Sequence, residues 1–197
     1  METVNERRLV LIRASADGTE CDVPPSDDDL MLLARGGARE AFDQLVVRHQ
    51  TRMLRVAFRL LRESACAADA VQNTFVELFC NLTRYRACGK FKSYLYRLLL
   101  NQCRRVMRRG RTEQRALATV SAMQHLTHDQ ILEHEHQHDL NRRLAVISPK
   151  QRAVLLLRFT ADLGYQEIAD TLDIPVGTVK SRVSEAVARM RETMEDA

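Results

Sequence analysis

The chain has 197 residues, of which 45% are hydrophobic and 28% charged, with a formal net charge of +4, a composition typical of one or two small globular domains. Its apolar runs are shorter than the roughly 20 residues that span a bilayer, and its N-terminus lacks a basic segment followed by an apolar one. We therefore expect a cytoplasmic protein without a signal peptide. The small numbers of Pro (four) and Gly (seven), with few alternating β-branched runs, favour an all-α fold.

The five cysteines are scattered along the chain without CxxC spacing, and their number is odd. This pattern argues against a disulfide framework and against a Cys-rich zinc site. We expect reduced and mostly buried thiols, and neither a metal nor another cofactor.

The first predicted helix follows a segment, residues 1–25, that has no sustained period and ends in VPPS, so we expect a mobile tail there. Ser26 offers an N-cap, and Asp29 three residues later completes a capping box that opens a short helix through Leu33. The Gly36-Gly37 pair then ends this helix.

Two longer amphipathic patterns come next, over 39–62 and 64–82. The apolar side of the first, in which a histidine is expected at the core or its boundary, comprises Phe42, Leu45, Val46, His49, Met53, Val56, Ala57 and Leu60. The apolar stripe of the second comprises Val71, Phe75, Leu78, Phe79 and Leu82. Its outward-facing polar side chains, whose simplest role is to be solvated, are Asp69, Gln72, Asn73 and Glu77.

A loop over Thr83–Lys90, TRYRACGK, connects to a fourth predicted helix over Phe91–Arg109. Its inward residues are predicted to be Phe91, Leu95, Leu98, Leu99 and Val106. The helix runs into QCRRVMRRGRTEQR, a stretch with six Arg and one Glu, which fits a solvated helix end or a nucleic-acid patch. These four helices predict one domain over about 26–109.

A polar segment over 110–138 has weak periodicity and predicts a flexible linker. The second domain then spans 139–197. In it, Ser148-Pro149 is a strong helix start, since Pro at the first helical position has its fixed φ already helical. The helix that follows, KQRAVLLLRFTADL, should support the elements after it.

Two short helical patterns around a tight turn predict a helix-turn-helix over Leu163–Arg189. The first carries Ile168, Ala169 and Leu172 inward, and Asp173 lies at the turn because Asp tolerates positive φ. After Pro175, the buried stripe of the second helix comprises Val179, Val183, Ala186, Val187 and Met190. The opposite stripe, expected to meet base edges in a DNA major groove, comprises Lys180, Ser181, Ser184 and Glu185.

Together the two domains resemble a bacterial sigma factor of the extracytoplasmic-function group. ISPKQRAVLLLRF followed by GYQEIADTLDIPVGTVKSRV resembles sigma region 4, while GAREAFDQLVVRHQ, AADAVQNTFVEL and FKSYLYRLLLNQCRRVMRR occur in the order and at the spacing of sigma region 2. The resemblance implies an all-α protein of two small helical domains joined by a flexible linker. It further implies binding to core RNA polymerase, through the clamp helices of its largest subunit and its flap, and to promoter DNA. Control by an anti-sigma factor, often membrane-bound, is also implied.

The resemblance assigns expected sites by position. Asp69, Gln72 and Asn73 would face the clamp helices, although Asn73 departs from the commoner Glu. The residues expected near the −10 element are Arg84, Tyr85, Arg86, Lys90, Tyr94, Asn101, Arg104, Arg105 and Arg108. Among these, Tyr94 could equally belong to the core, and Asn101 could equally bond backbone within the domain. Aromatic stacking on an unstacked base and Arg or Lys beside phosphates are suited to this role.

The residues expected near the −35 element are Lys180, Ser181, Arg182, Ser184 and Glu185. Glu185 replaces a second basic residue that this helix often carries. It could accept a hydrogen bond from a cytosine amine. It could also form ion pairs with Arg182 and Arg189 at helical spacing, which is the role we favour.

Two other classes of protein remain open from the residues. One is a stand-alone helix-turn-helix regulator, which would need a dimer seam that the sequence does not supply clearly. The other is a metal-binding protein using His134, His136 and His138, but their polar segment lacks an apolar shell to orient the rings. No constellation of catalytic side chains is recognisable, so we do not expect an enzyme.

Overall fold

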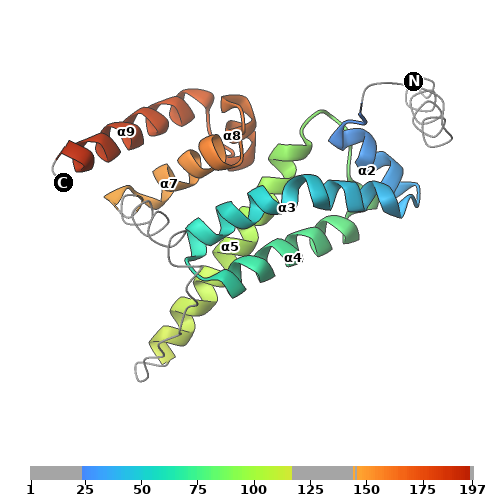
Figure 1. The fold of residues 1–197 in the computed structure, drawn as a ribbon, viewed down its shortest axis with the longest axis horizontal. Helices are drawn as coiled ribbons and strands as arrows, with labels where there is room; N and C mark the ends of the chain where they lie inside the picture. The colour runs from blue at the N-terminus through green and yellow to red at the C-terminus, as the bar shows by residue number, and fades with distance from the viewer. Residues whose placement is uncertain (1–23, 117–143, 145, 196–197) are drawn as a thin grey trace, which may run out of the picture.

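The computed structural model describes residues 24–116, 144 and 146–195, and within them every regular element is helical. Figure 1 shows an N-terminal group of helices and, beside it, a C-terminal group. The elements are α2 (Asp27–Arg35), α3 (Arg39–Leu61), α4 (Ser64–Cys80), a 3₁₀ turn η1 (Leu82–Arg84), α5 (Phe91–Ala116), α7 (Pro149–Leu155), a π-helical turn η2 (Leu156–Thr160), α8 (Tyr165–Leu172) and α9 (Val176–Glu195). The predicted all-α class with two helical domains is confirmed.

The capping signals at the start of α2 act as predicted. The Ser26 hydroxyl accepts a hydrogen bond from the Asp29 amide at 3.2 Å, and the Asp29 carboxylate accepts one from the Ser26 amide at 3.2 Å. Both bonds satisfy amides that a helix start leaves without partners. Gly37 follows the helix with φ +98°, a left-handed value that glycine adopts at little cost, so the chain turns here into α3.

The N-terminal domain packs α3, α4 and α5 around one core (Figure 1). Leu45, Met53, Leu78, Leu95 and Leu99 are fully buried in it. His49 is buried as expected, with its ring centroid 5.4 Å from that of Phe91. The predicted end of the fourth helix at Arg109 is wrong, since α5 continues to Ala116. A single glycine at 110 costs a helix only about 1 kcal/mol and does not stop it.

The C-terminal domain has the predicted helix-turn-helix. Ser148 caps α7 in a capping box with Gln151, and Pro149 occupies the first turn. Asp173 ends α8 with φ 55°, the left-handed conformation that its position requires. Ile168 and Val179 are fully buried where α8 and α9 face each other. The turn and both inward stripes are therefore confirmed.

The two domains contact each other through α5 with α8 and through α3 with η2. The Ser93 hydroxyl on α5 donates a hydrogen bond of 3.0 Å to the backbone carbonyl of Glu167 on α8. At the second contact, the Arg59 guanidinium donates to the Thr160 hydroxyl at 2.5 Å. The sequence predicted two domains on a flexible linker and gave no sign of this contact. The predicted tail, most of the linker and the three histidines at 134, 136 and 138 lie outside the described residues.

Two expectations about side chains on the surface are wrong. Phe79, assigned to the inward stripe of α4, is 56% exposed and packs edge-on against the Phe42 ring. Of the cysteines in the described part of the chain, Cys103 is buried but Cys80 and Cys88 are exposed, so the thiols are not mostly buried. Burial raises the pKa of the Cys103 thiol to about 12, which keeps it protonated and unreactive at neutral pH.

Candidate nucleic-acid and protein interfaces

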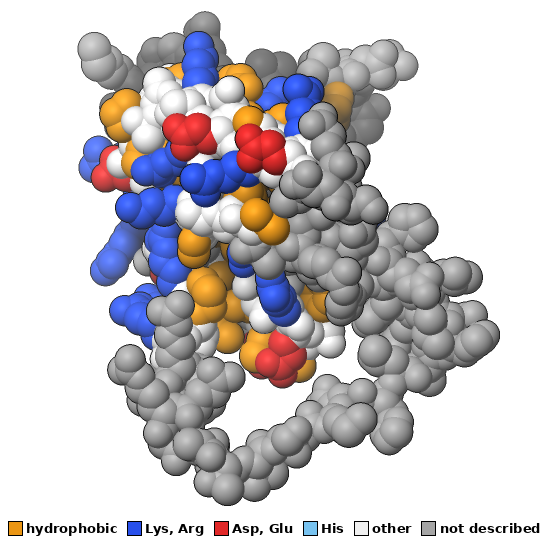
Figure 2. All heavy atoms as spheres, turned by 90° about the vertical axis from the view of Figure 1, so that its left-hand side faces the viewer, with side chains coloured by type: hydrophobic (Ala, Val, Ile, Leu, Met, Phe, Trp, Pro, Cys, Tyr) orange, Lys and Arg blue, Asp and Glu red, His pale blue; other side chains and the backbone are white. Residues whose placement is uncertain are grey.

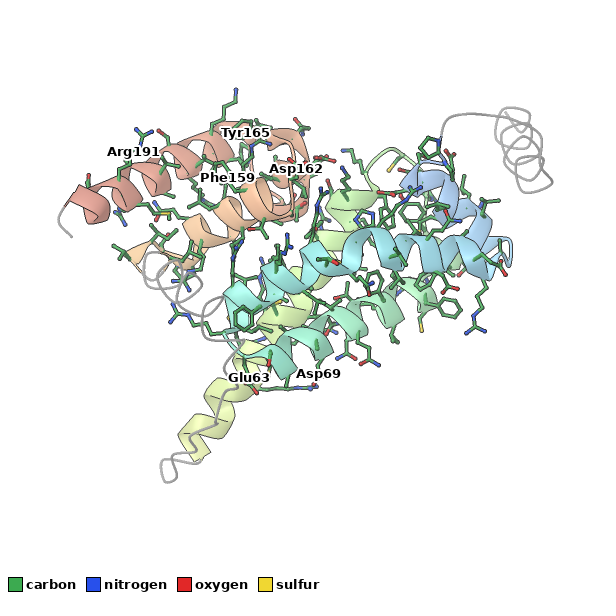
Figure 3. The ribbon with its side chains drawn as sticks, viewed as in Figure 1. Glu63, Asp69, Phe159, Asp162, Tyr165 and Arg191 are labelled. Atoms are coloured by element: carbon green, nitrogen blue, oxygen red, sulfur yellow. The ribbon has the colours of Figure 1, made fainter. Side chains whose placement is uncertain are left out.

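One face of α4 is turned away from the domain core. Asp69, Gln72 and Asn73 are exposed on it, while Phe75 and Leu78 lie on the buried side. In Figure 3 the Asp69 side chain points outward from the N-terminal part of α4. The structure thus brings the three predicted residues onto one accessible surface, where a protein partner can reach them.

This α4 face also carries apolar side chains that the sequence assignment missed. Val76 is 54% exposed, and Phe79, one turn further, is 56% exposed. Val76 lies seven residues after Asp69 and three after Asn73, so helical spacing could have placed it on the same face. Exposed apolar groups beside polar ones are typical of a protein–protein surface, whose central part is more apolar than its rim.

The loop between α4 and α5 presents cations over a buried tyrosine. Arg84, Arg86 and Lys90 are exposed, whereas the Tyr85 side chain is only 7% exposed. The Tyr85 ring packs near Phe91 and Tyr94, with ring centroids 6.1 Å and 5.7 Å away. Burial and the neighbouring Asp28 carboxylate raise the pKa of the Tyr85 phenol, which keeps it a neutral hydrogen-bond donor. Tyr85 therefore packs in the core beneath the exposed loop residues, and its ring is not accessible to a base in this arrangement.

Lys90 and Arg97 lie against the C-terminal domain. The Lys90 ammonium forms an ion pair of 3.0 Å with the Asp170 carboxylate on α8, and the Arg97 guanidinium donates to the Asp170 backbone carbonyl. The hydrogen bond from Lys90 lowers the pKa of Asp170. Asp170 of α8 thus binds one cation of the loop, Lys90, and one of α5, Arg97.

This ion pair predicts a pH-dependent contact between the domains. Because the pKa of Asp170 is lowered in the folded chain, its contribution is present above the ordinary carboxyl pKa and is lost as the pH falls through the lowered value. An exposed pair contributes at most about 1 kcal/mol. We expect Asp170→Asn to increase the distance between labels on the two domains slightly at pH 7, measured by energy transfer, and to remove part of its change on acidification. An identical acid response in wild type and variant would contradict this.

Basic side chains lie along α5 after Asn101 in the described part of the chain. Arg104, Arg105 and Arg108 are exposed, and Asn101 is half-buried with its side-chain oxygen accepting a hydrogen bond of 3.0 Å from Arg104. Glu77 on α4 lies 3.7 Å from Arg105 and accepts a 2.6 Å hydrogen bond from Gln102. Glu77 was expected to face solvent, and instead it joins α4 to α5.

The outward face of α9 carries the predicted polar side chains. Lys180, Ser181, Ser184 and Glu185 are exposed, Arg182 is half-buried, and the Val179 side of the helix is in the core. The Glu185 carboxylate accepts a 3.0 Å hydrogen bond from the Gln151 amide on α7. This partner was not foreseen, because it lies 34 residues away along the chain. Figure 2 looks onto the end of the molecule with α7 and α9 and shows many Lys and Arg side chains there, with acidic ones among them.

An apolar groove lies where α9, the α7–η2 helix and the end of α3 meet. Phe159 borders it and is 67% exposed, and Arg191 and Arg59 provide positive charge at its edges. Figure 3 shows Phe159 and Arg191 on the C-terminal domain, the former at η2 and the latter near the end of α9. The apolar residues that line the groove are Leu144, Leu155, Leu156, Phe159, Val187 and Met190. Both domains contribute to its walls.

Within the described residues, no cluster of three or more His, Cys, Asp or Glu side chains is arranged to hold a metal ion. The same part of the chain has no helix of the length and apolarity that crossing a membrane requires.

These features define a two-domain helical protein with a helix-turn-helix and a separate exposed helix face. Residues 45–113 match the family model for Sigma-70 region 2, and residues 137–190 match that for Sigma-70 region 4. The chain belongs to the sigma-70 family, in its extracytoplasmic-function group.

Similarity to individual sigma factors supports this membership. The chain is 32% identical over 164 residues to the ECF RNA polymerase sigma factor SigE of Mycolicibacterium smegmatis, a match that covers 79% of this chain and 62% of that protein. It is 24% identical over 172 residues to SigW of Bacillus subtilis, covering 81% of this chain and 92% of SigW.

Solved structures share the fold. The structure of CnrH in complex with the cytosolic domain of CnrY superposes with a TM-score of 0.70 at 24% identity, over 86% of this chain and 97% of that one. RpoE of Bartonella quintana, in complex with the anti-sigma factor NepR, gives a TM-score of 0.64 at 22% identity, over 78% of this chain and 96% of that one.

Proposed function

We propose that the chain is an alternative sigma factor, which binds core RNA polymerase and directs it to specific promoters. The observation that carries the proposal is that one chain holds two surfaces: an exposed, mixed polar and apolar face on α4, and a helix-turn-helix with an exposed outward face on α9. The first suits a protein partner and the second suits the DNA major groove. The chain would act as an initiation factor in the cytoplasm and not as a catalyst.

On the polymerase side, Asp69, Gln72 and Asn73 are the contacts that we propose for the clamp helices of the largest subunit. Val76 adds apolar area at the middle of this face. The apolar groove beside Phe159 would receive the polymerase flap. Acidic and apolar contacts on two domains fit a partner that holds both domains at once.

On the DNA side, the loop cations Arg84, Arg86 and Lys90 are proposed to follow the non-template strand of the −10 element. The exposed arginines at 104, 105 and 108 would contact the −10 duplex, since cations facing phosphates supply most of the sequence-independent affinity. Tyr94 is half-buried beside Tyr85, so part of its ring can reach a base. The exposed α9 residues would read the −35 element.

We further propose control by an anti-sigma factor, and a membrane-bound one remains the expectation. The apolar groove is walled by both domains and edged by Arg59 and Arg191. An amphipathic helix with acidic flanks would fit such a groove. A partner seated there would occupy the surface proposed for the flap and keep the polymerase away.

The direct test is run-off transcription with purified core polymerase and a library of promoter templates. We expect transcripts only when the chain is added, from templates that share −10 and −35 elements. The isolated chain should bind duplex DNA weakly. Nanomolar, sequence-specific footprints by the chain alone at physiological salt would instead indicate a stand-alone regulator.

The Glu185 contact predicts an effect on −35 preference. Because its carboxylate accepts from Gln151, Glu185 is held against α7 and is less free to reach a cytosine amine. We expect Glu185→Ala to change activity about equally on all −35 sequences. A preference change confined to one base pair, worth roughly 1–3 kcal/mol, would instead support base reading. Gln151→Glu is the matched comparison, because it keeps an oxygen for the capping box with Ser148 while removing the amide group that donates to Glu185.

A further inference from the structure

The first turn of α2 contains three consecutive aspartates, and each carboxylate has a different task. Acidic residues at a helix start are commonly explained by the helix dipole alone. Here Asp29 closes the capping box with Ser26. Asp27 pairs with His49 at 2.9 Å and with Arg48 at 3.1 Å. Burial raises the pKa of Asp27, but these two partners outweigh it and lower the pKa overall. Asp28 takes part in neither arrangement.

Asp28 binds the loop between α4 and α5 instead. One oxygen, Oδ1, accepts hydrogen bonds from the Tyr85 hydroxyl at 2.8 Å, the Cys88 amide at 3.0 Å and the Gly89 amide at 3.2 Å. These donors lie 57 to 61 residues further along the chain. Bonds to a charged acceptor are about twice as strong as neutral ones, so the carboxylate is a firm anchor for the loop.

The rest of the local structure makes this anchor specific. Gly89 has φ +71°, a left-handed value that turns its amide toward α2 and that other residues adopt rarely. Arg35, at the far end of α2, donates to the Tyr85 carbonyl at 3.4 Å. Residues 86–90 of this loop are exposed. Tyr85, Cys88 and Gly89 thus hold the loop against α2. Arg86 remains exposed, and the Lys90 ammonium pairs with Asp170.

We propose that Asp28 is a positioning residue for promoter reading. It fixes the conformation in which the loop presents Arg86 to the −10 strand, and Lys90 joins Arg86 there once its ion pair with Asp170 is exchanged for DNA. Asp28 itself touches no DNA. The proposal rests on the proposed −10 role of this loop. Without the Asp28 carboxylate the loop cations are still present, but the loop can adopt several conformations and their positions vary. A displacement of about 1 Å is enough to weaken a polar contact.

The test compares six variants in the holoenzyme, of which Arg86→Ala and Lys90→Ala check the −10 role of the loop itself. Asp28→Ala removes the acceptor, Asp28→Asn keeps a carbonyl oxygen in its place, and Tyr85→Phe removes one of the three donors while keeping the buried ring. Asp43→Ala is the control, because Asp43 is an exposed aspartate on α3. Initiation is measured on templates that vary one −10 or −35 base at a time, together with affinity for core polymerase and helicity.

We expect Asp28→Ala to lower the discrimination at the −10 base nearest the loop by about tenfold, with −35 discrimination and core affinity unchanged. Asp28→Asn should stay within about threefold of wild type, and Tyr85→Phe should fall between the two. If Asp28→Ala loses helicity, Tyr85→Phe carries the test alone. Amide exchange at Cys88 and Gly89 should accelerate in Asp28→Ala and not in Asp43→Ala.

Two results would overturn the proposal, and they differ from failure of the −10 role. Equal losses of −10 discrimination, −35 discrimination and core affinity in Asp28→Ala would show a general structural role. Unchanged −10 discrimination in Asp28→Ala, while Arg86→Ala and Lys90→Ala reduce it, would show that the loop reads DNA without this anchor. If Arg86→Ala and Lys90→Ala have no effect either, the proposed −10 role of the loop is itself wrong.

Discussion

Asp69→Arg should weaken binding to core polymerase by tenfold or more, equivalent to about 1.4 kcal/mol or above. Asp69 is exposed on the α4 face that also carries Gln72, Asn73 and Val76. Reversing a charge at an interface places like charges together, which costs more than losing an attraction. The fold should be unaffected, because substitutions of exposed residues usually change stability by less than about 0.5 kcal/mol. The measurements are core-polymerase affinity and circular dichroism.

The matched control is Asp43→Arg, which makes the same charge change at an exposed position of α3. It should retain core affinity within about twofold. If both variants lose affinity equally, the loss reflects the change in net charge. If Asp69→Arg binds as wild type does, the proposed polymerase face of α4 is wrong.

Phe159→Asp should reduce binding of a partner to the apolar groove by about thirtyfold or more. Phe159 is 67% exposed beside the groove, and large aromatic residues at the centre of an interface commonly contribute 2 kcal/mol or more to binding. The substitution also places an acidic group beside Arg191, where it would repel acidic flanks of a bound helix. Affinities for the isolated polymerase flap and for the co-expressed anti-sigma partner are the quantities to measure.

Val47→Asp provides the comparison for this variant, because Val47 is 69% exposed on α3 and does not line the groove. Both substitutions put a carboxylate where an exposed apolar side chain stood, so a shared effect on solubility or folding would appear in both. Loss of partner binding only in Phe159→Asp supports the groove as the docking surface. Full binding by Phe159→Asp would exclude it.

The contacts between the two domains must be partly broken when the chain binds a promoter as proposed. Lys90 and Arg97 are held by Asp170 on α8, and Ser93 bonds the Glu167 carbonyl. The Asp170 carboxylate and a DNA phosphate would compete for the Lys90 ammonium, so Lys90 must leave Asp170 to bind DNA. These contacts are few and partly exposed, so they are readily exchanged for contacts with polymerase and DNA.

The helices, their caps and the helix-turn-helix could be predicted from local sequence patterns. Ser26 with Asp29, Ser148 with Pro149, and Asp173 at the turn act through neighbours within a few residues, so the chemistry that fixes them is local. The buried stripes of α3 and α9 were equally predictable, because their spacing follows from the helical period. Membership of the family could also be predicted, because the sequence motifs of the two sigma regions lie on these helices.

Which side chains remain accessible at the candidate sites depends on long-range packing and could not be predicted in this way. The Tyr85 ring is buried near Phe91 and Tyr94, and its hydroxyl donates a hydrogen bond to Asp28, 57 residues before it. The Glu185 carboxylate accepts a hydrogen bond from Gln151 across 34 residues. Phe79 is 56% exposed, although its ring packs edge-on against the Phe42 ring of α3. The contact between α5 and α8 likewise joins segments more than 70 residues apart. Such contacts depend on how helices pack against each other, and the periodicity within a single helix carries no information about them.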